Sequence, residues 1–276
     1  MNNSTDRNIV LAEVGVGAVS RLFAVLRCLG DCDEGGERVT QLAKRVGLSQ
    51  PTTHRLLRSL MDEGMVEQDL LSKRYRLSIE FFALAARAGN TGNLRDVVRP
   101  SLLRLSASLG DSLFLLARSG FDAICLDRSE GPYPIRTFTG DIGGRVALGV
   151  GQGSLAILAF LPEDERETVI AYNLPRLKDF HLYDEVFLRS EVDNVRRLGY
   201  AGRNTGALPG MAVPILDRSG RAVAALSVAT ISDRLGPDRL STVVELLKRE
   251  ATAISAKINP FDPSLRRPSQ VFGQAE

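Results

Sequence analysis

Apolar residues recur at helical spacing in three short stretches within the first third of the chain. The pattern predicts helices over 18–30, 39–46 and 49–63, each followed or ended by a glycine (Gly30, Gly47, Gly64). Ser49 is a suitable N-cap for the third helix, and Pro51 fits its first turn, where no backbone hydrogen bond is lost. The residues expected to face the core are Leu22, Phe23, Val25, Leu26 and Leu29 in the first helix, and Val39, Leu42, Ala43 and Val46 in the second.

After these helices the spacing of apolar residues changes from a helical period to alternation. Apolar and polar residues alternate over 65–78 around a polar turn at Ser72-Lys73, which predicts a small β-hairpin. Residues 79–87 return to an apolar helical pattern, and 89–93 have the composition of a linker. Three short helices and a hairpin in this order are the layout of a winged helix-turn-helix.

The rest of the chain predicts strands paired through turns and interrupted by helices. Such an order is typical of an α+β domain with a mainly antiparallel sheet. The expected helices are 94–109, 152–161, 163–172, 184–198 and 237–257, and the expected strands are 111–119, 122–129, 134–139, 211–217 and 222–230.

These patterns divide the chain into five segments. We expect a flexible arm (1–17), a winged helix-turn-helix domain (18–78), a linker helix and hinge (79–93), a second domain (94–259) and a flexible tail (260–276).

Composition narrows the class of protein. The 276 residues are 44% hydrophobic and 25% charged, which is typical of globular domains and excludes a largely disordered chain. No apolar run is long enough to span a membrane, and the N-terminus does not resemble a secretory signal. Three cysteines without a CxxC pair argue against a disulfide scaffold or a zinc site and favour a cytoplasmic location.

The net charge of +2 is uninformative, but the distribution of charge is not. Between Arg38 and Met61 there are five basic residues and no acidic one. On a helical wheel of the third helix, Thr53, Leu57, Leu60 and Met61 share one face, whereas Thr52, Arg55 and Ser59 point the other way with Pro51 and Arg58 beside them. Hydroxyl and guanidinium groups contact phosphates and read guanine edges in the major groove.

The hairpin adds a basic wing. The residues expected to contact DNA are therefore Arg38, Ser49, Gln50, Pro51, Thr52, Thr53, Arg55, Arg58 and Ser59, together with Lys73, Arg74, Tyr75 and Arg76 on the wing. The alternative is an ordinary solvated basic face, but helix order, spacer, hydroxyl cluster and wing occur together. We expect His54 to be a boundary residue that packs within the domain.

The stretch VTQLAKRVGLSQPTTHRLLRSLMDEGMVEQDLLSKRYRLS resembles the DNA-binding domain of the IclR family of bacterial transcriptional regulators. The similarity continues in segments such as LGVGQGSLAILAFLP and GRAVAALSVATISDRLGPDRL, and spans roughly residues 18–258. The resemblance implies operator DNA as a partner, a homodimer or dimer of dimers, and a GAF-like second domain that binds a small-molecule effector.

Catalytic motifs are missing from the second domain. The G-x-S-x-G elbow is absent around Ser154, and the glycine run 149–154 is neither G-x-G-x-x-G nor a P-loop. A Cys125–His181 pair is conceivable, but Cys125 lies in an apolar strand where a buried, inert thiol is expected. We therefore expect no enzyme activity, no metal and no cofactor.

The resemblance implies that the effector pocket lies between the sheet and the LGVGQGSLA loop and helix. Glycines allow close backbone approach, and amides at a helix N-terminus favour a carboxylate. The alternative is a glycine-rich connection that is merely tight. The expected effector-binding residues are Leu148, Gly151, Gln152, Gly153, Ser154, Arg203, Asn204, Met211, Ser227 and Ala229.

This sequence departs from the family pattern at several positions of the expected pocket, so the effectors of family members indicate only the broad class of its own effector. Gly149 stands where relatives usually carry a histidine, and Arg203 stands where they commonly carry an acidic residue, whereas Ser227 matches a pocket serine. The sequence thus predicts a ligand-responsive transcriptional regulator with a small organic or aromatic acid as effector. The alternative is a metabolite-binding protein or enzyme whose helix-turn-helix serves protein contacts.

Overall fold

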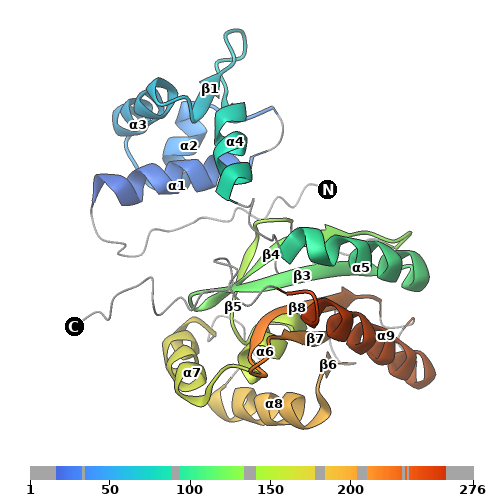
Figure 1. Ribbon diagram of the computed structural model, residues 1–276. Helices are drawn as coiled ribbons and strands as arrows, with labels where there is room; N and C mark the ends of the chain where they lie inside the picture. Colours follow the sequence, from blue (N-terminus) through green and yellow to red (C-terminus); the bar gives the residue numbers. More distant parts are fainter. Residues whose placement is uncertain are drawn as a thin grey trace. The chain divides into compact units, whose positions relative to one another are not determined.

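The computed structural model describes residues 17–32, 35–88, 94–133, 141–177, 184–203, 210–231, 234 and 236–258, and these form two compact units, 1–90 and 91–276 (Figure 1). The arm before residue 17, the strand expected at 134–139 and the tail after residue 259 lie outside the described residues. Each unit is described by itself below.

The first unit contains the three helices and the hairpin in the predicted order. Its elements are α1 (Ala18–Gly30), α2 (Val39–Val46), α3 (Gln50–Asp62), β1 (Val66–Gln68), β2 (Tyr75–Leu77) and α4 (Ile79–Ala88). Strands β1 and β2 pair antiparallel, with Glu67 opposite Arg76. The winged helix-turn-helix layout is confirmed.

Leucines and valines from α1, α2 and α3 form one core with Val66 and Tyr75 of the hairpin. Leu42, Ala43, Val46, Leu57 and Leu60 are buried as predicted. Two expectations were wrong, because Phe23 is 49% exposed and Met61 is 39% exposed. Both residues lie at the margin of a narrow apolar stripe, and a three-helix core is too small to cover them.

The second unit is built on one antiparallel sheet. Its strands are β3 (Ser112–Ser119), β4 (Asp122–Ser129), β5 (Arg145–Ala147), β6 (Ala201–Arg203), β7 (Gly210–Leu216) and β8 (Ala222–Ala229). Its helices are α5 (Leu94–Leu109), α6 (Gln152–Ala159), α7 (Glu163–Leu177), α8 (Glu185–Leu198) and α9 (Pro237–Ser255). The strand order is β5-β4-β3-β8-β7-β6, and every pairing among the described strands is antiparallel. The predicted α+β class with an antiparallel sheet is confirmed.

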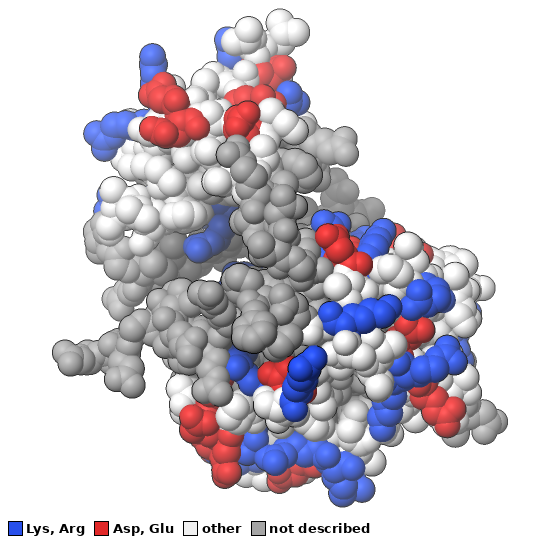
Figure 2. All heavy atoms as spheres, viewed as in Figure 1, with Lys and Arg blue, Asp and Glu red and all other residues white. Residues whose placement is uncertain are grey.

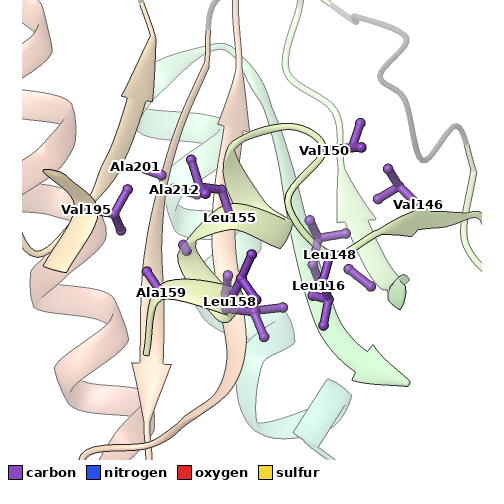
Figure 3. Close-up of a cluster of buried hydrophobic side chains, with 14 of the residues drawn as sticks. Leu116, Val146, Leu148, Val150, Leu155, Leu158, Ala159, Val195, Ala201 and Ala212 are labelled. Atoms are coloured by element: carbon purple, nitrogen blue, oxygen red, sulfur yellow. The ribbon is translucent and has the colours of Figure 1, made fainter. Parts of the chain in front are cut away.

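Helices cover both faces of this sheet (Figure 1). Helices α5 and α9 pack on one face over a core that includes Leu113, Leu115 and Leu226. Helices α6, α7 and α8 pack on the other, over a second core that includes Leu116, Leu148 and Leu158 (Figure 3). The pleat sends alternate side chains of each central strand into the two cores.

The short edge strands β5 and β6 were not predicted, because three residues are too few to show an alternating pattern. Two helix ends were also misplaced. Helix α6 ends at Ala159 rather than at residue 161, and α7 continues to Leu177 rather than ending at residue 172. Leu177 is fully buried, so packing extends α7 past Pro175.

Candidate functional site

The start of helix α3 is set by Ser49. Its Oγ accepts a hydrogen bond from Thr52 N and lies 2.8 Å from Thr52 Oγ1. The Thr53 hydroxyl donates to the Ser49 carbonyl, 3.1 Å away. These contacts satisfy backbone groups that helix formation leaves unpaired, so α3 begins at Gln50 with Pro51 in its first turn.

The outward face of α3 carries the side chains that the helical wheel assigned to it. Gln50, Pro51, Arg55, Arg58 and Ser59 are exposed, and Thr52 is half-buried. The Ser59 hydroxyl donates to the Arg55 carbonyl, which keeps it close to the helix. Two guanidinium groups on one exposed helix face can reach base edges and phosphates.

Two residues of α3 lie elsewhere than expected. Thr53 is fully buried and so cannot form part of an exposed interface, although it was among the expected contacts. His54 is exposed rather than packed at the boundary of the core. The wheel had already placed Thr53 with the core leucines, and burial rather than residue type decides its role.

The wing presents fewer free cations than its sequence suggests. Arg74 donates to the Gly36 carbonyl at 2.9 Å and faces Glu37, and Arg76 pairs with Glu67 across the hairpin at 2.5 Å. Tyr75 is 3% exposed and belongs to the core, so the expectation that it lies between the wing cations at the DNA was wrong. Lys73 is exposed at the turn, where its φ is +58°.

Among the other basic residues of the helix-turn-helix, some are exposed and one is held by a contact within the domain. Arg38 precedes α2 and is exposed, as is Lys44. The Arg45 guanidinium instead donates to Cys32 Sγ at 3.3 Å. Figure 2 shows Lys and Arg atoms at the end of the first unit that carries α3 and the hairpin, with acidic atoms beside them. Glu37 and Glu67, which neutralise part of the wing, could not be recognised before the strands were paired.

In the second unit, glycines shape the entry to α6. Gly149 and Gly151 have φ values of +108° and +75°, which glycine adopts without steric cost. The Ser154 hydroxyl donates to the Val150 carbonyl at 2.5 Å and accepts from Gly149 N at 3.2 Å. Ser154 is buried, and its hydroxyl therefore holds this loop together rather than facing a ligand.

Gln152, Gly153 and Ser227 are brought together on the α6 face of the sheet. A β-carbon added to Gly153 would overlap Leu116 and would lie 3.3 Å from the Ser227 β-carbon. Ser227 is half-buried and pairs with Phe114 and Ala212 on the neighbouring strands. Gln152 Oε1 is buried and has no hydrogen-bond partner in the part of the chain that the structure describes. A small polar spot thus lies among small residues at the start of α6.

Gly210 belongs to the same spot and was missed. A β-carbon on it would lie 3.8 Å from Gln152 Cγ, and it pairs with Ala229, which faces the α6 core. Phe114, opposite Ser227, was missed as well. The available signal for Gly210 was the Pro-Gly pair in the sequence immediately before Met211. Phe114 offered none, because a phenylalanine in an apolar strand usually indicates only core packing.

Other expected effector contacts are not part of this spot. Met211 is fully buried in the core under α5 and α9, on the opposite face of the sheet from α6. Leu148 is fully buried in the α6 core. Arg203 ends β6, but its side chain and the whole of Asn204 lie outside the described residues.

Cys125 is fully buried, and burial raises the pKa of its thiol to about 11. The expected burial of this thiol is confirmed, whereas His181 lies outside the described residues. None of the helices described is long and apolar enough to cross a membrane.

Comparisons with known proteins agree with this architecture. Residues 18–70 match the IclR helix-turn-helix domain, and residues 87–256 match the domain described as bacterial transcriptional regulator IclR C-terminal. The chain is 28% identical to the HTH-type transcriptional regulator KdgR of Escherichia coli over 90% of this chain and 94% of KdgR. It is 27% identical to the regulator KipR of Bacillus subtilis over 80% of this chain and 89% of KipR.

Solved structures show the same fold. An IclR regulator from Alicyclobacillus acidocaldarius superposes with a TM-score of 0.73 at 23% identity, over 88% of this chain and 99% of that one. An IclR homologue from Microbacterium hydrocarbonoxydans, crystallised with 4-hydroxybenzoate, also has a TM-score of 0.73, at 24% identity over 87% of this chain and 98% of that one. The two domain matches, in order along the chain, place this protein in the IclR family of bacterial transcriptional regulators.

Proposed function

We propose that this regulator binds operator DNA through the exposed face of α3 and that a small carboxylate bound near Gln152 and Ser227 controls it. The observation that carries the first part is the pair Arg55 and Arg58 on one exposed helix face. Gln50, Thr52 and Ser59 add neutral hydrogen-bonding groups beside them. Thr53 and Tyr75 are left out of this surface because both are buried.

In this arrangement α3 lies in the major groove and the wing lies beside it. Arg55 and Arg58 read base edges or phosphates, and Arg38 and Lys73 contact the phosphate backbone. Arg74 acts through the wing, because its guanidinium is bound to Gly36 and faces Glu37. It holds the hairpin against the segment that leads into α2.

We also propose that the protein binds as a homodimer or a dimer of dimers. Apolar side chains on two helices of the first unit support a self-association face: Val19 and Phe23 on α1, and Ile79 and Leu84 on α4, are 49–73% exposed. A dimer also matches the paired half-sites that helix-turn-helix proteins bind.

DNA binding is tested by fluorescence anisotropy with duplexes from the intergenic region upstream of the gene. If each protomer neutralises about four phosphates, the logarithmic salt slope of a dimer is on the order of −7. Arg55→Ala is expected to weaken binding by about 1–3 kcal/mol. The control Arg197→Ala, on α8 of the second unit, removes an exposed cation and is expected to change nothing. A slope near zero, or equal affinities for both variants, would favour a helix-turn-helix that serves protein contacts.

The effector proposal rests on the polar spot at the start of α6. Among the described residues, Gln152 contributes a buried oxygen without a hydrogen-bond partner and Ser227 a half-buried hydroxyl, and α6 begins at Gly151 without a side-chain cap for the N–H groups of its first turn. The hydroxyl and N–H groups suit a carboxylate, and the Gln152 oxygen suits a hydroxyl on the same ligand. The 4-hydroxybenzoate bound to the Microbacterium relative carries both groups and motivates including hydroxylated aromatic acids in a thermal-shift screen.

A further inference from the structure

Two adjacent leucines stand at the tip of the wing. Leu70 is 78% exposed and Leu71 is 95% exposed, and both lie in the turn between β1 and β2. Figure 1 shows this loop projecting from the first unit, away from its helices. Isolated exposed leucines are ordinary, but two in succession on a projecting tip form an apolar surface of small area.

The tip is held by a network of hydrogen bonds centred on Asp69. Its Oδ1 accepts from Leu71 N at 3.2 Å, from Ser72 N at 2.6 Å and from the Ser72 hydroxyl at 2.7 Å. The Asp69 carbonyl accepts from Lys73 N, and Asp69 N donates to the Arg74 carbonyl. Hydrogen bonds from Ser72, for which the ionised carboxylate is the better acceptor, hold the pKa of the Asp69 carboxyl below its usual range. The leucines are therefore presented in a fixed shape.

The surroundings of the tip indicate what it contacts. Lys73 is exposed immediately after the leucines, while the charge of Asp69 is directed into the turn and that of Glu67 is paired with Arg76. A specific protein interface needs about 1,000 Å² or more of buried surface, which a two-leucine tip cannot supply. A narrow apolar wedge with the exposed cation of Lys73 beside it matches the minor groove, where side chains such as leucine insert between base steps.

We propose that Leu70 and Leu71 form an apolar wedge that enters the minor groove beside the operator half-site and unstacks a base step. This proposal rests on the DNA-binding function proposed above. Insertion kinks DNA toward the major groove by about 20–90° and favours sites with a flexible pyrimidine–purine step. The wing would then select operators by deformability, whereas α3 reads base edges.

The absence of tryptophan from the sequence permits a direct test. Leu71→Trp in the full-length protein introduces a single reporter at the tip. With operator duplex, its emission is expected to be quenched by base stacking and shielded from acrylamide. With heparin, a polyanion without bases, it is expected to stay accessible. The control Val186→Trp, on α8 at a site that is 78% exposed against 95% for Leu71, is expected to respond to neither.

DNA bending gives a second readout. On circularly permuted operator fragments, the parent protein and Leu71→Met are expected to bend the DNA, whereas the double variant Leu70→Ser/Leu71→Ser binds about tenfold more weakly and leaves it nearly straight. The wedge would be overturned if the parent protein bound DNA in a salt-dependent way without bending it and the tryptophan of Leu71→Trp stayed accessible to acrylamide. The proposed function would then still stand. Failure of the parent protein to bind DNA at all would overturn both.

Discussion

Gly153 at the start of α6 lies against Leu116 on strand β3 so closely that a β-carbon on the glycine would overlap the leucine side chain. The Ser227 β-carbon closes the other side at 3.3 Å. Small residues on the facing strands, Ala212 and Ala225, complete this close approach of helix and sheet. The glycine is therefore required by packing, and the ligand-binding role proposed for this helix start rests on its neighbours Gln152 and Ser227.

Gly153→Ala is expected to destabilise the second unit by about 1–3 kcal/mol, because Leu116 is buried and has little room to move. Thermal unfolding measures the change. Gly236→Ala, at the N-cap of α9, is the control, since a β-carbon there meets nothing within 4 Å. In a double-mutant cycle with Leu116→Ala, the two costs are expected to be less than additive. Strict additivity would show that the two side chains do not compete for space.

Ser227→Ala is expected to weaken effector binding by about 0.5–1.5 kcal/mol, or roughly 2- to 13-fold, through the loss of one neutral hydrogen bond. Calorimetry with the acid found in the screen measures it. The substitution is distant in sequence from the helix-turn-helix, so affinity for DNA without effector is expected to hold within about twofold. Gln152→Leu removes the polar group that α6 contributes to the proposed site, and it is likewise expected to weaken effector binding. Unchanged effector affinity in both variants would place the binding site elsewhere in the second unit.

Arg74→Ala is expected to lower the stability of the first unit by about 0.5–1.5 kcal/mol, because its bond to the Gly36 carbonyl is lost from a partly exposed site. The affinity for operator and for unrelated DNA is expected to fall by similar factors, since the wing loosens without loss of a base contact. Arg76→Ala, which breaks the exposed pair with Glu67, is the milder control. A loss confined to the operator would instead indicate that Arg74 reads a base.

Stability is expected to fall as the pH rises from about 9 to 11. Burial raises the pKa of Cys28 and of Cys125 to about 11 from the ordinary 9.0, so between these values the unfolded chain releases thiol protons that the folded chain retains. Each thiol contributes on the order of 1–3 kcal/mol at the upper end of this range. Urea unfolding at pH 8, 9.5 and 10.5 measures it. Cys125→Ala is expected to flatten the dependence for the second unit, and an unchanged slope in that variant would show that other groups cause the loss.

The sequence by itself determined the order of elements in the first unit and the outward face of α3. Both follow from local rules. Helical periodicity separates Leu57 and Leu60 from Arg55 and Arg58 without any knowledge of what packs against the helix. Ser49 likewise marks the start of α3 because its cap bond is made to a residue three positions ahead.

Long-range pairing decided the rest. From the sequence, Tyr75 was predicted to lie on the wing surface, but in the paired hairpin its side chain is buried in the core. Arg74 was predicted to be a free cation, but the fold places Gly36 and Glu37 beside it. In the sheet, Met211 pairs with Val228 and so shares its face under α5 and α9, whereas Ser227 pairs with Ala212 on the face under α6. A strand's own alternation identifies two faces, but only the register and the covering helices decide which face meets α6.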